Sequence, residues 1–266
     1  MKDRFGREIN YLRVSVTDRC NLRCRYCTPA EGVSLLPREK ILSYEEILDV
    51  VVEAVALGVT KVRLTGGEPL VRQDIVRLVQ MLAGVDAIKD LCMSTNGILL
   101  EQFAQPLAEA GLQRVNISLD AMSPQRYRYI TRGGAVSRVL AGIDAAREAG
   151  LQPVKLNCVV EESADEPDAR AVARFGREND LPVRFIPRMD LQEGIFSTVD
   201  GGTGGECDTC NRLRLSADGF IRPCLFSDLA YSVRKLGAAQ ALKTAIQNKP
   251  RRGTSCEQCY MRRIGG

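Results

Sequence analysis

Cysteine provides the clearest chemical signal in this sequence. The chain contains ten Cys and no His, so the most common general base and metal ligand of enzymes is absent. Most cysteines gather at residues 20–27, 207–224 and 256–259, whereas Cys92 and Cys158 stand alone in apolar runs, as buried small hydrophobes do. A secreted disulfide framework would normally occupy a smaller, loop-rich chain with an export signal. Clustered thiols without histidine therefore favour iron–sulfur clusters over most zinc hydrolase sites, in a reducing cytoplasm.

The first three cysteines, Cys20, Cys24 and Cys27, have the spacing C-x3-C-x2-C and follow the first predicted strand directly. Three thiolates on one short loop can hold three irons of a 4Fe–4S cube and leave the fourth iron open. A zinc site or unrelated thiols are the alternatives, but zinc would need a fourth ligand nearby and none is obvious within the loop. The spacing therefore favours a cluster.

Basic residues mark a second kind of site. Arg13, Arg63, Lys155 and Arg184 lie within or beside predicted parallel strands, where exposed charge is not expected. Internal ion pairs are one explanation for each residue. An anionic ligand such as a triphosphate in the mouth of a barrel explains all four better, because arginine offers paired donors to phosphate oxygens. Two further arginines at residues 212 and 214 alternate and could point the same way, or they could face solvent.

The elements that must position these residues follow a regular pattern. Strands are expected at residues 11–16, 60–65, 88–94, 113–119, 153–160 and 182–186. The clearest helix spans residues 44–57, because Ser43 and Glu46 have capping-box spacing at its start and Gly58 ends it. Six such βα units predict an α/β fold with a parallel, barrel-like sheet, whose ligands bind at the C-terminal strand ends.

An internal repeat supports this pattern and also shows where it stops. The segment Glu-Ala-Gly-Leu-Gln occurs at residues 109–113 and again at 148–152, each time with Gly between a helix and a strand. After Asp190 the pattern fails, and residues 194–205 are glycine-rich and loop-like. We therefore expect a barrel over residues 1–190 and a small second domain over residues 191–266.

Composition excludes several other classes of protein. The 266 residues are 45% hydrophobic and 26% charged, as in globular proteins. The net charge of +4 is too small to indicate nucleic acid as the main partner. No apolar run is long enough for a membrane span, and the first ten residues are too polar for a signal peptide. We expect a cytoplasmic protein with a small-molecule substrate, with a homodimer as one option for its assembly.

One βα unit after the cysteine loop stands Thr65-Gly-Gly-Glu-Pro69. By itself this motif would be an ordinary turn, but together with C-x3-C-x2-C it resembles the signature of the radical S-adenosylmethionine superfamily. The resemblance implies a partial (β/α)6 barrel with the cysteine loop after its first strand. It also implies that Gly66, Gly67, Glu68 and Pro69 help to bind S-adenosylmethionine. The glycines would allow close approach to the ligand, and the Glu68 carboxylate and nearby carbonyls would receive the methionine ammonium group.

Over most of its length the chain resembles one family within that superfamily, the GTP 3′,8-cyclases of molybdenum cofactor biosynthesis. The matching stretches are residues 12–20, 62–69, 94–97 and 116–120, and the C-x2-C-x13-C pattern of Cys207, Cys210 and Cys224. The chain also ends in Gly265 and Gly266, as chains of that family do. In the family this tail reaches into the active site and is needed for activity.

The resemblance implies a role for each matching residue. Cys20, Cys24 and Cys27 would hold the radical-generating 4Fe–4S cluster, and Cys207, Cys210 and Cys224 a second, auxiliary 4Fe–4S cluster. The positions that contact S-adenosylmethionine in the family also include Tyr26, Ser118 and Met189. The positions that contact GTP are Arg13, Arg63, Ser94, Lys155, Arg212, Leu213 and Arg214. Ser94 stands where the family more usually has Thr, but it retains the hydroxyl group.

The resemblance also implies the reaction. A reductant such as flavodoxin or ferredoxin supplies one electron, and cleavage of S-adenosylmethionine gives a 5′-deoxyadenosyl radical. This radical removes hydrogen from ribose C3′ of GTP, and the carbon radical attacks C8 of guanine to give (8S)-3′,8-cyclo-7,8-dihydroguanosine 5′-triphosphate. The auxiliary cluster binds the purine through its open iron. No histidine is needed for this chemistry, because the cofactor performs the difficult step.

The sequence departs from the family at three places. Only 17 residues separate Met189 from Cys207, where full-length cyclases have several dozen more. Pro187 and Arg188 stand where the family usually has an acidic residue, and the pair Cys256 and Cys259 has no counterpart in the common pattern. One of this pair could ligate the auxiliary cluster. These departures leave open a radical enzyme that acts on another substrate, such as a peptide. A non-catalytic iron–sulfur or zinc protein is a third option. The intact Gly-Gly-Glu-Pro motif argues against it, because an electron carrier has no use for an S-adenosylmethionine site.

Overall fold

Six parallel strands form most of a nine-stranded sheet in the computed structural model, which describes residues 1–257 and 261–264. These strands are β1 (Tyr11–Ser15), β2 (Lys61–Thr65), β3 (Asp90–Thr95), β4 (Arg114–Ser118), β5 (Lys155–Val160) and β6 (Val183–Pro187). Each strand overlaps the range that the sequence predicts, with ends that differ by one or two residues. The predicted α/β class and the parallel, barrel-like arrangement are confirmed.

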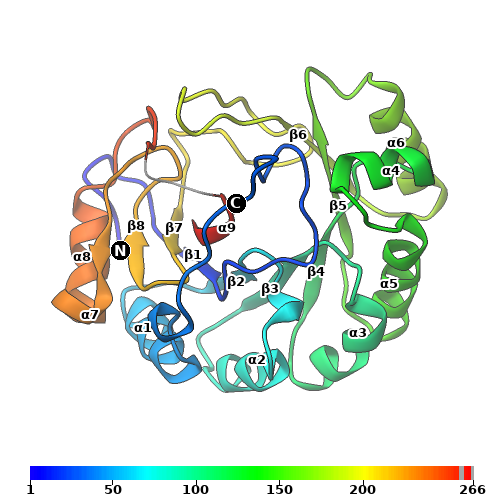
Figure 1. Cartoon of the computed structure of the whole chain (residues 1–266). Coiled ribbons are helices and arrows are strands. Elements are labelled where there is room, and N and C mark those ends of the chain that lie inside the picture. Colours follow the sequence, from blue (N-terminus) through cyan, green and yellow to red (C-terminus); the bar gives the residue numbers. More distant parts are fainter. Residues whose placement is uncertain (258–260, 265–266) are drawn as a thin grey trace.

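The order of strands in the sheet is β6-β5-β4-β3-β2-β1-β7-β8-β9. The last three strands are β7 (Arg212–Leu215), β8 (Phe220–Arg222) and β9 (Tyr231–Ser232). β7 pairs with β1 in parallel, whereas β8 and β9 continue the sheet in antiparallel fashion. The sheet curves around a central space and stays open between its two edges (Figure 1). The sequence pattern did not predict β7 to β9, which extend the sheet beyond the boundary proposed near residue 190.

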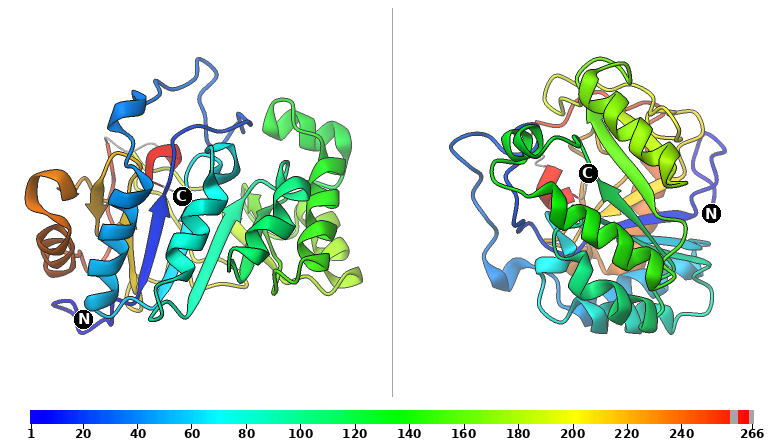
Figure 2. Two further views of the ribbon diagram at one scale, coloured as in Figure 1. Left: turned by 90° about the horizontal axis from the view of Figure 1, so that it is seen from below. Right: turned by 90° about the vertical axis from the view of Figure 1, so that its right-hand side faces the viewer.

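The helices cover the outer face of the curved sheet (Figures 1 and 2). They are α1 (Tyr44–Ala56), α2 (Ile75–Ala83), α3 (Leu100–Glu109), α4 (Pro124–Thr131), α5 (Val136–Glu148), α6 (Pro167–Glu178), α7 (Val233–Leu236) and α8 (Ala238–Gln247), with short 3-10 turns at Arg38–Lys40 and Pro69–Val71. The final short helix, α9 (Met261–Ile264), lies within the curve of the sheet, beside β1. Among the described residues, no helix has the length and apolar character that crossing a membrane requires.

Local signals in the sequence explain where the helices begin and end. The Ser43 hydroxyl accepts from the backbone N–H of Glu46 at 3.1 Å, and the Glu46 carboxylate accepts from the N–H of Ser43 at 2.7 Å, which confirms the predicted capping box. Gly58, Gly111 and Gly150 follow α1, α3 and α5 with φ values of 98°, 98° and 76°. Such left-handed conformations suit glycine, so the repeated glycines end helices as predicted.

Alternation along β1 separates the hydrophobic core from the interior of the barrel. Leu12 and Val14 are fully buried in the main core, which lies between the sheet and its helices. Arg13 lies between them in sequence and therefore points to the opposite face of the strand. The inner face of the sheet thus carries polar and charged residues, and these line the site described below.

Candidate functional site

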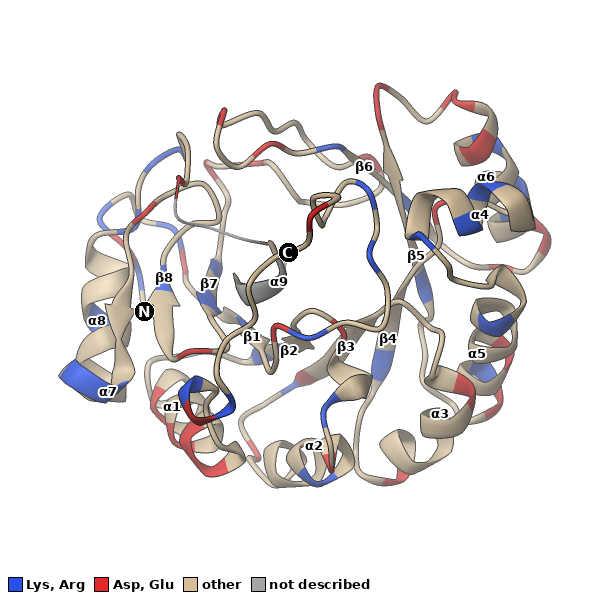
Figure 3. Ribbon diagram, viewed as in Figure 1, with Lys and Arg blue, Asp and Glu red and all other residues tan. Residues whose placement is uncertain are grey.

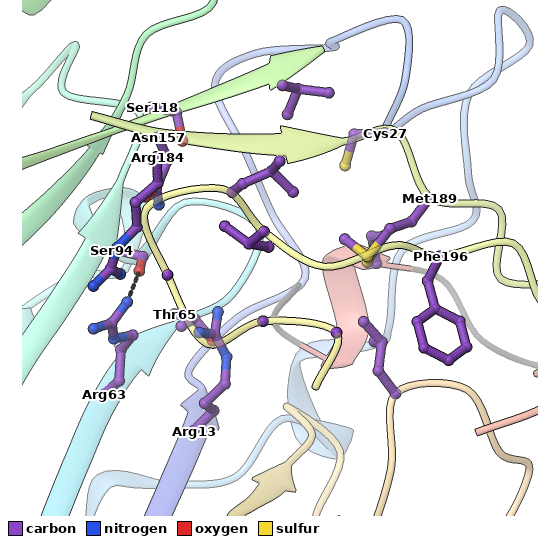
Figure 4. Close-up of a pocket in the computed structure, with 18 of the residues that line it drawn as sticks. Arg13, Cys27, Arg63, Thr65, Ser94, Ser118, Asn157, Arg184, Met189 and Phe196 are labelled. Atoms are coloured by element: carbon purple, nitrogen blue, oxygen red, sulfur yellow. Dashed lines mark hydrogen bonds between the residues drawn. The ribbon is translucent and has the colours of Figure 1, made fainter. Parts of the chain in front are cut away.

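A cavity of about 430 Å³ lies inside the barrel at the carboxyl ends of the parallel strands (Figure 4). All six predicted cluster ligands line it, namely Cys20, Cys24, Cys27, Cys207, Cys210 and Cys224. So do eleven other predicted site residues, namely Arg13, Tyr26, Arg63, Gly66, Gly67, Glu68, Ser94, Ser118, Met189, Arg212 and Arg214. The fold thus gathers into one cavity residues that lie up to 211 positions apart in the chain.

Arginines from three adjacent strands stand side by side on the inner face of the sheet. Parallel pairing places Arg13 of β1 opposite Arg63 of β2 on one side and opposite Arg214 of β7 on the other. Paired residues on neighbouring strands point to the same face of a sheet, and so do residues two positions apart on one strand. Arg212 is two positions before Arg214 on β7 and therefore shares this face. Figure 4 shows Arg13, Arg63 and Arg184 directed toward a common space, and Figure 3 shows basic residues on the strands around the barrel. Arg184 comes from β6 at the edge of the sheet and lines the same cavity. We call Arg13, Arg63, Arg184, Arg212 and Arg214 together the arginine row.

The arginine row concentrates positive charge where water is limited. Burial, followed by the charges of Arg13 and Arg212, lowers the pKa of Arg214 to about 9. Burial and the neighbouring Arg63 likewise lower the pKa of Arg184. Within the described part of the chain, Arg63, Arg184 and Arg212 form no ion pair with a carboxylate. Internal ion pairs therefore do not explain these three residues, and an anionic ligand would relieve their repulsion.

The end of α4 holds the first cysteine loop in place. The backbone N–H groups of Arg23 and Arg25 donate to carbonyls in the last turn of α4 at 3.2 and 2.9 Å. Arg132, which follows α4, donates from Nη1 to the Thr28 carbonyl at 2.8 Å. Backbone and side-chain hydrogen bonds therefore fix a loop that has no regular secondary structure of its own.

The two glycines of the Gly-Gly-Glu-Pro motif allow two backbones to touch. A Cβ atom on Gly66 would lie 2.6 Å from the carbonyl oxygen of Thr17, and one on Gly67 would lie 2.2 Å from that of Arg19. The N–H of Gly67 donates to the Thr17 carbonyl at 2.7 Å, and the N–H of Glu68 to the Arg19 carbonyl at 2.8 Å. The sequence explained these glycines by close approach to a ligand. The structure adds a different reason, which is close approach to the segment that leads into the first cysteine.

The Glu68 carboxylate ties the end of β2 to the end of β3. Its Oε1 accepts from the Thr95 hydroxyl at 2.7 Å and from the Leu70 N–H at 3.1 Å, and its Oε2 accepts from the Asn96 N–H at 2.7 Å. Burial raises the pKa of Glu68 to about 7, although these hydrogen bonds oppose the shift. Protein donors thus occupy much of the carboxylate. Its contact with the methionine ammonium group stays a prediction.

Asp120 is a site residue that the sequence did not single out. Its Oδ2 accepts from the Tyr26 hydroxyl at 2.8 Å, and its Oδ1 accepts from the Val159 N–H at 2.9 Å. Burial raises the pKa of Asp120 to about 6, against the effect of both hydrogen bonds. Asp120 follows β4 directly and lines the cavity, and that position after a strand was the signal that could have identified it. It orients Tyr26, which lies within the first cysteine loop.

A hairpin brings the late cysteines together. Cys207 and Cys210 precede β7, Cys224 follows β8, and these two strands pair in antiparallel fashion. Burial alone would raise the pKa of the Cys210 thiol, but the charges of Lys249 and Arg212 lower it to about 6. The surroundings of this thiol therefore favour the thiolate that metal ligation requires.

A buried ion pair near the N-terminus anchors the same region. Arg7 and Asp3 form a salt bridge at 2.7 Å, with side chains that are almost completely buried. Arg7 also donates to the carbonyls of Cys207 and Pro250, at 2.7 Å each. The first turn of the chain thus fixes the backbone of a predicted cluster ligand, a contact that no sequence pattern indicated.

Some predicted residues lie outside the cavity wall. Leu213 is fully buried in the main core, and Pro69 is buried beside the cavity. Lys155 lies on the same face of β5 as Asn157, which lines the cavity, but one step further from its mouth. Gly265 and Gly266 lie outside the described residues, as does Cys259. Met261, in α9, lines the cavity.

The glycine-rich segment 194–205 closes one side of the cavity. Asp200 and Phe185 of β6 exchange two backbone hydrogen bonds of 3.1 Å, which fold the segment back along the sheet. Gly201 permits this contact, because a Cβ atom there would lie 2.7 Å from the Val183 carbonyl. Phe196 lines the cavity and stacks on Phe226 with ring centroids 4.4 Å apart. The shortened segment therefore forms part of the binding site.

The cysteines suit a cluster better than a single metal ion. No group of three His, Cys, Asp or Glu side chains among residues 1–257 and 261–264 is arranged to hold one ion. A tetrahedral zinc site would draw its sulfur atoms to within about 4 Å of each other, because Zn–S bonds are about 2.3 Å long. A cube of four irons separates its thiolates further. The two sets of three cysteine thiols that line the cavity fit this larger group.

Comparison with known proteins places this site in context. A sequence profile of the radical SAM superfamily matches residues 14–175. GTP 3′,8-cyclase from Thermodesulfovibrio yellowstonii is 41% identical over 282 residues, which cover 89% of this chain and 88% of that protein. GTP 3′,8-cyclase from Moorella thermoacetica is 43% identical over 294 residues, or 92% and 91% of the two chains.

One alignment also reports on the shortened segment. GTP 3′,8-cyclase from Peptoclostridium acidaminophilum is 37% identical over 317 residues, which cover 99% of this chain and 98% of that protein. This alignment is longer than the 266 residues of the chain. The relative therefore carries additional residues that the present chain lacks, in line with the shortening noted from the sequence.

Solved structures share the fold. Native anSMEcpe with bound AdoMet superposes with a TM-score of 0.63 at 16% identity, covering 90% of this chain and 81% of that one. Methylornithine synthase (PylB) gives a TM-score of 0.57 at 18% identity, with coverage of 77% and 62%. At such identities the similarity concerns the fold alone.

Proposed function

Because the chain belongs to the radical SAM superfamily and, within it, to the GTP 3′,8-cyclase family, we propose that its cavity binds GTP between two 4Fe–4S clusters. The protein is a radical S-adenosylmethionine enzyme of the cyclase type. Its relatives support this activity and not the alternative of a peptide substrate. The observation that carries the substrate assignment is the arginine row, which lines the same cavity as both sets of cysteines.

Different residues of the chain have different roles in this proposal. Cys20, Cys24 and Cys27 would hold the first cluster, which together with S-adenosylmethionine would supply the radical chemistry. The backbone contact at Gly67 and the hydrogen bond between Tyr26 and Asp120 keep the cysteine loop in a single position. Cys207, Cys210 and Cys224, which line the same cavity, would hold the second cluster. The glycine-rich segment and α9 exclude water from the cavity between them.

The arginine row receives the triphosphate. Arg63 presents its Nη1 to the Ser94 hydroxyl at 3.4 Å and its Nε to the Cys92 sulfur at 3.3 Å, so the guanidinium is oriented before any ligand binds (Figure 4). Arg13 lies next to Arg63 on β1, and Arg214 lies beyond Arg13 on β7. Paired donors from adjacent strands match successive phosphate groups better than scattered lysines would.

Replacing Arg63 with methionine tests this assignment. We expect GTP to bind the reconstituted variant at least about tenfold more weakly, since losing a charge-assisted contact costs about 1.5–3 kcal/mol. Arg77→Met is the matched control, because Arg77 is an exposed arginine on α2 that pairs with Glu45 outside the cavity. Isothermal titration calorimetry measures both affinities. Absence of GTP binding to the wild type, or equal affinities in both variants, would contradict the assignment.

We further propose that the reductant is an acidic flavodoxin or ferredoxin that docks outside the first cysteine loop. Four arginines form what we call the docking surface: Arg23 and Arg25 lie in this loop, Arg128 is an exposed residue of α4, and Arg132 follows α4 and contacts the loop. None of them forms an ion pair within the described residues. Arg25 stacks its guanidinium 3.8 Å from the ring of Tyr129, which is 52% exposed. This surface would attract an acidic donor to the loop that carries the predicted ligands of the first cluster. Such a donor and reduced thiols both suit a cytoplasmic enzyme.

Charge reversal tests the docking surface. Arg25→Glu combined with Arg128→Glu should slow 5′-deoxyadenosine formation driven by reduced flavodoxin by roughly tenfold at low salt. The same variant should keep the wild-type rate when dithionite supplies the electron. Arg174→Glu, an exposed change on α6, should affect neither rate. Equal losses with both reductants would show damage to the cluster loop and refute the docking role.

A further inference from the structure

Lys249 is a buried cation that the proposed reaction does not yet use. Lys249 is only 1% exposed and lies two residues after the end of α8. The ammonium group donates to the Arg212 carbonyl at 2.7 Å and to the Pro223 carbonyl at 2.5 Å. Arg212 lies two residues after Cys210, and Pro223 directly precedes Cys224. One side chain therefore joins the two backbone segments that carry the predicted ligands of the second cluster.

Among the described residues, no carboxylate lies within ion-pair distance of Lys249 to balance its charge. The other charged groups that act on it are the guanidinium of Arg7, which is also positive, and the sulfur atoms of Cys210 and Cys224. Two carbonyl dipoles satisfy part of its hydrogen-bonding capacity, but they carry no net charge. A buried ammonium group in such a place is stable only if an anion lies near it.

The thiolates of the second cluster can be this anion. Cysteines must lose their protons to ligate iron, and three thiolates around a cube give the occupied site a net negative charge. The cube would lie between the same segments that Lys249 connects. The positive charge and the ligand set are thus complementary, and burial strengthens their attraction.

We propose that Lys249 is the internal counter-ion of the second cluster, a positioning residue that stabilises its thiolate-ligated form. This inference rests on the proposed function, because it requires the second cluster. It differs from a purely structural role in one respect. A structural crosslink would stabilise the protein equally with and without iron, whereas a counter-ion stabilises chiefly the iron-loaded protein.

The test uses the full chain with the first cluster removed. In the background Cys20→Ala, Cys24→Ala, Cys27→Ala, anaerobic reconstitution can load only the second site. Lys249→Met is introduced into this background, because methionine fills similar space without charge or N–H donors. Lys243→Met is the matched control, since Lys243 is an exposed residue on α8. Each protein is measured by iron content, by thermal unfolding with and without iron, and by a potentiometric titration followed by electron paramagnetic resonance.

Loss of the counter-ion should weaken the iron-loaded form specifically. We expect Lys249→Met to hold the cluster at least about tenfold more weakly against a chelator, as changes next to a metal site typically do. The gain in melting temperature on loading iron should be smaller than in the background protein by about 3–6 °C. The midpoint potential of the remaining cluster should become more negative, because removing a nearby positive charge disfavours the added electron. Lys243→Met should match the background protein in all three measurements.

The possible failures are distinguishable. If the background protein with Lys249 intact takes up no cluster, the second cluster of the proposed function fails. If it loads a cluster and Lys249→Met does so with equal retention, stability gain and potential, the counter-ion role is refuted while the second cluster stands. Equal destabilisation with and without iron assigns Lys249 a structural role and also overturns the proposal.

Discussion

Replacing Cys24 with alanine is expected to abolish the cleavage of S-adenosylmethionine to 5′-deoxyadenosine. Cys24 is the central member of C-x3-C-x2-C, and its thiol lines the cavity. Burial, followed by the nearby charge of Asp120, raises the pKa of this thiol to about 12 in the absence of iron. No other cysteine in this loop can replace it, because Cys20 and Cys27 supply the remaining ligands.

The measurement combines iron content with product formation. After anaerobic reconstitution and reduction with dithionite, Cys24→Ala should contain less iron per chain than the wild type and form no 5′-deoxyadenosine. Cys158→Ala is the control, because Cys158 is a lone buried cysteine on β5 that ligates no proposed cluster. It should keep its activity. Undiminished turnover in Cys24→Ala would remove the basis for assigning the first cluster to this loop.

Replacing Gly67 with alanine should produce the second-largest loss. The added Cβ atom would lie 2.2 Å from the carbonyl oxygen of Arg19 and 2.6 Å from its carbonyl carbon. Both neighbours are backbone atoms and cannot turn aside as a side chain would. The two segments must therefore separate, which breaks the hydrogen bonds of 2.7 and 2.8 Å that hold them together.

Separation of these segments displaces the cysteine loop relative to the end of β2. A shift of about 1 Å at a catalytic site can lower the rate a hundredfold, so we expect 5′-deoxyadenosine formation to fall by about that factor or more. Overpacking of this kind also lowers the free energy of unfolding by about 1–3 kcal/mol. Chemical denaturation and a product assay measure the two effects.

Gly84 provides the matched control for this substitution. It follows α2 with a φ of −71°, and a Cβ atom there would meet its nearest neighbour at an ordinary 3.5 Å. Gly84→Ala should leave both stability and product formation close to wild-type values. Wild-type activity in Gly67→Ala would mean that the close approach of the two segments is unnecessary for the chemistry.

Much of the local structure could be predicted from the sequence because its causes lie within a few residues of each other. Ser43 and Glu46 are three positions apart, and their capping box starts α1 where expected. Gly111 and Gly150 end helices because their φ values are positive. The spacing of the first cysteines likewise limits what a short loop can bind. The strands β7 to β9 were missed, because they are short and lack the alternating helices that marked the first six.

The chemistry of several residues depended on neighbours that are distant in the chain. Gly66 and Gly67 were explained by a ligand, but Thr17 and Arg19 are what they touch, some 50 positions earlier. Asp120 gained its role from contact with Tyr26. Lys249 appears in the sequence as an ordinary lysine near a helix end, since burial and the absence of a carboxylate partner are properties of the folded chain alone.

The arginine row shows most clearly what the sequence determines and what only the tertiary structure determines. The sequence by itself determined that Arg13, Arg63 and Arg184 lie on or beside strands, but it left open whether Arg212 and Arg214 point the same way. Only the tertiary structure decided that β7 pairs with β1, so that Arg214 lies opposite Arg13 although 201 positions separate them. Hydrophobic periodicity specifies which face of a strand is buried, but it does not specify which strands become neighbours. That choice depends on how all the strands and helices pack around one core, and it is what places the positive charges in a single cavity.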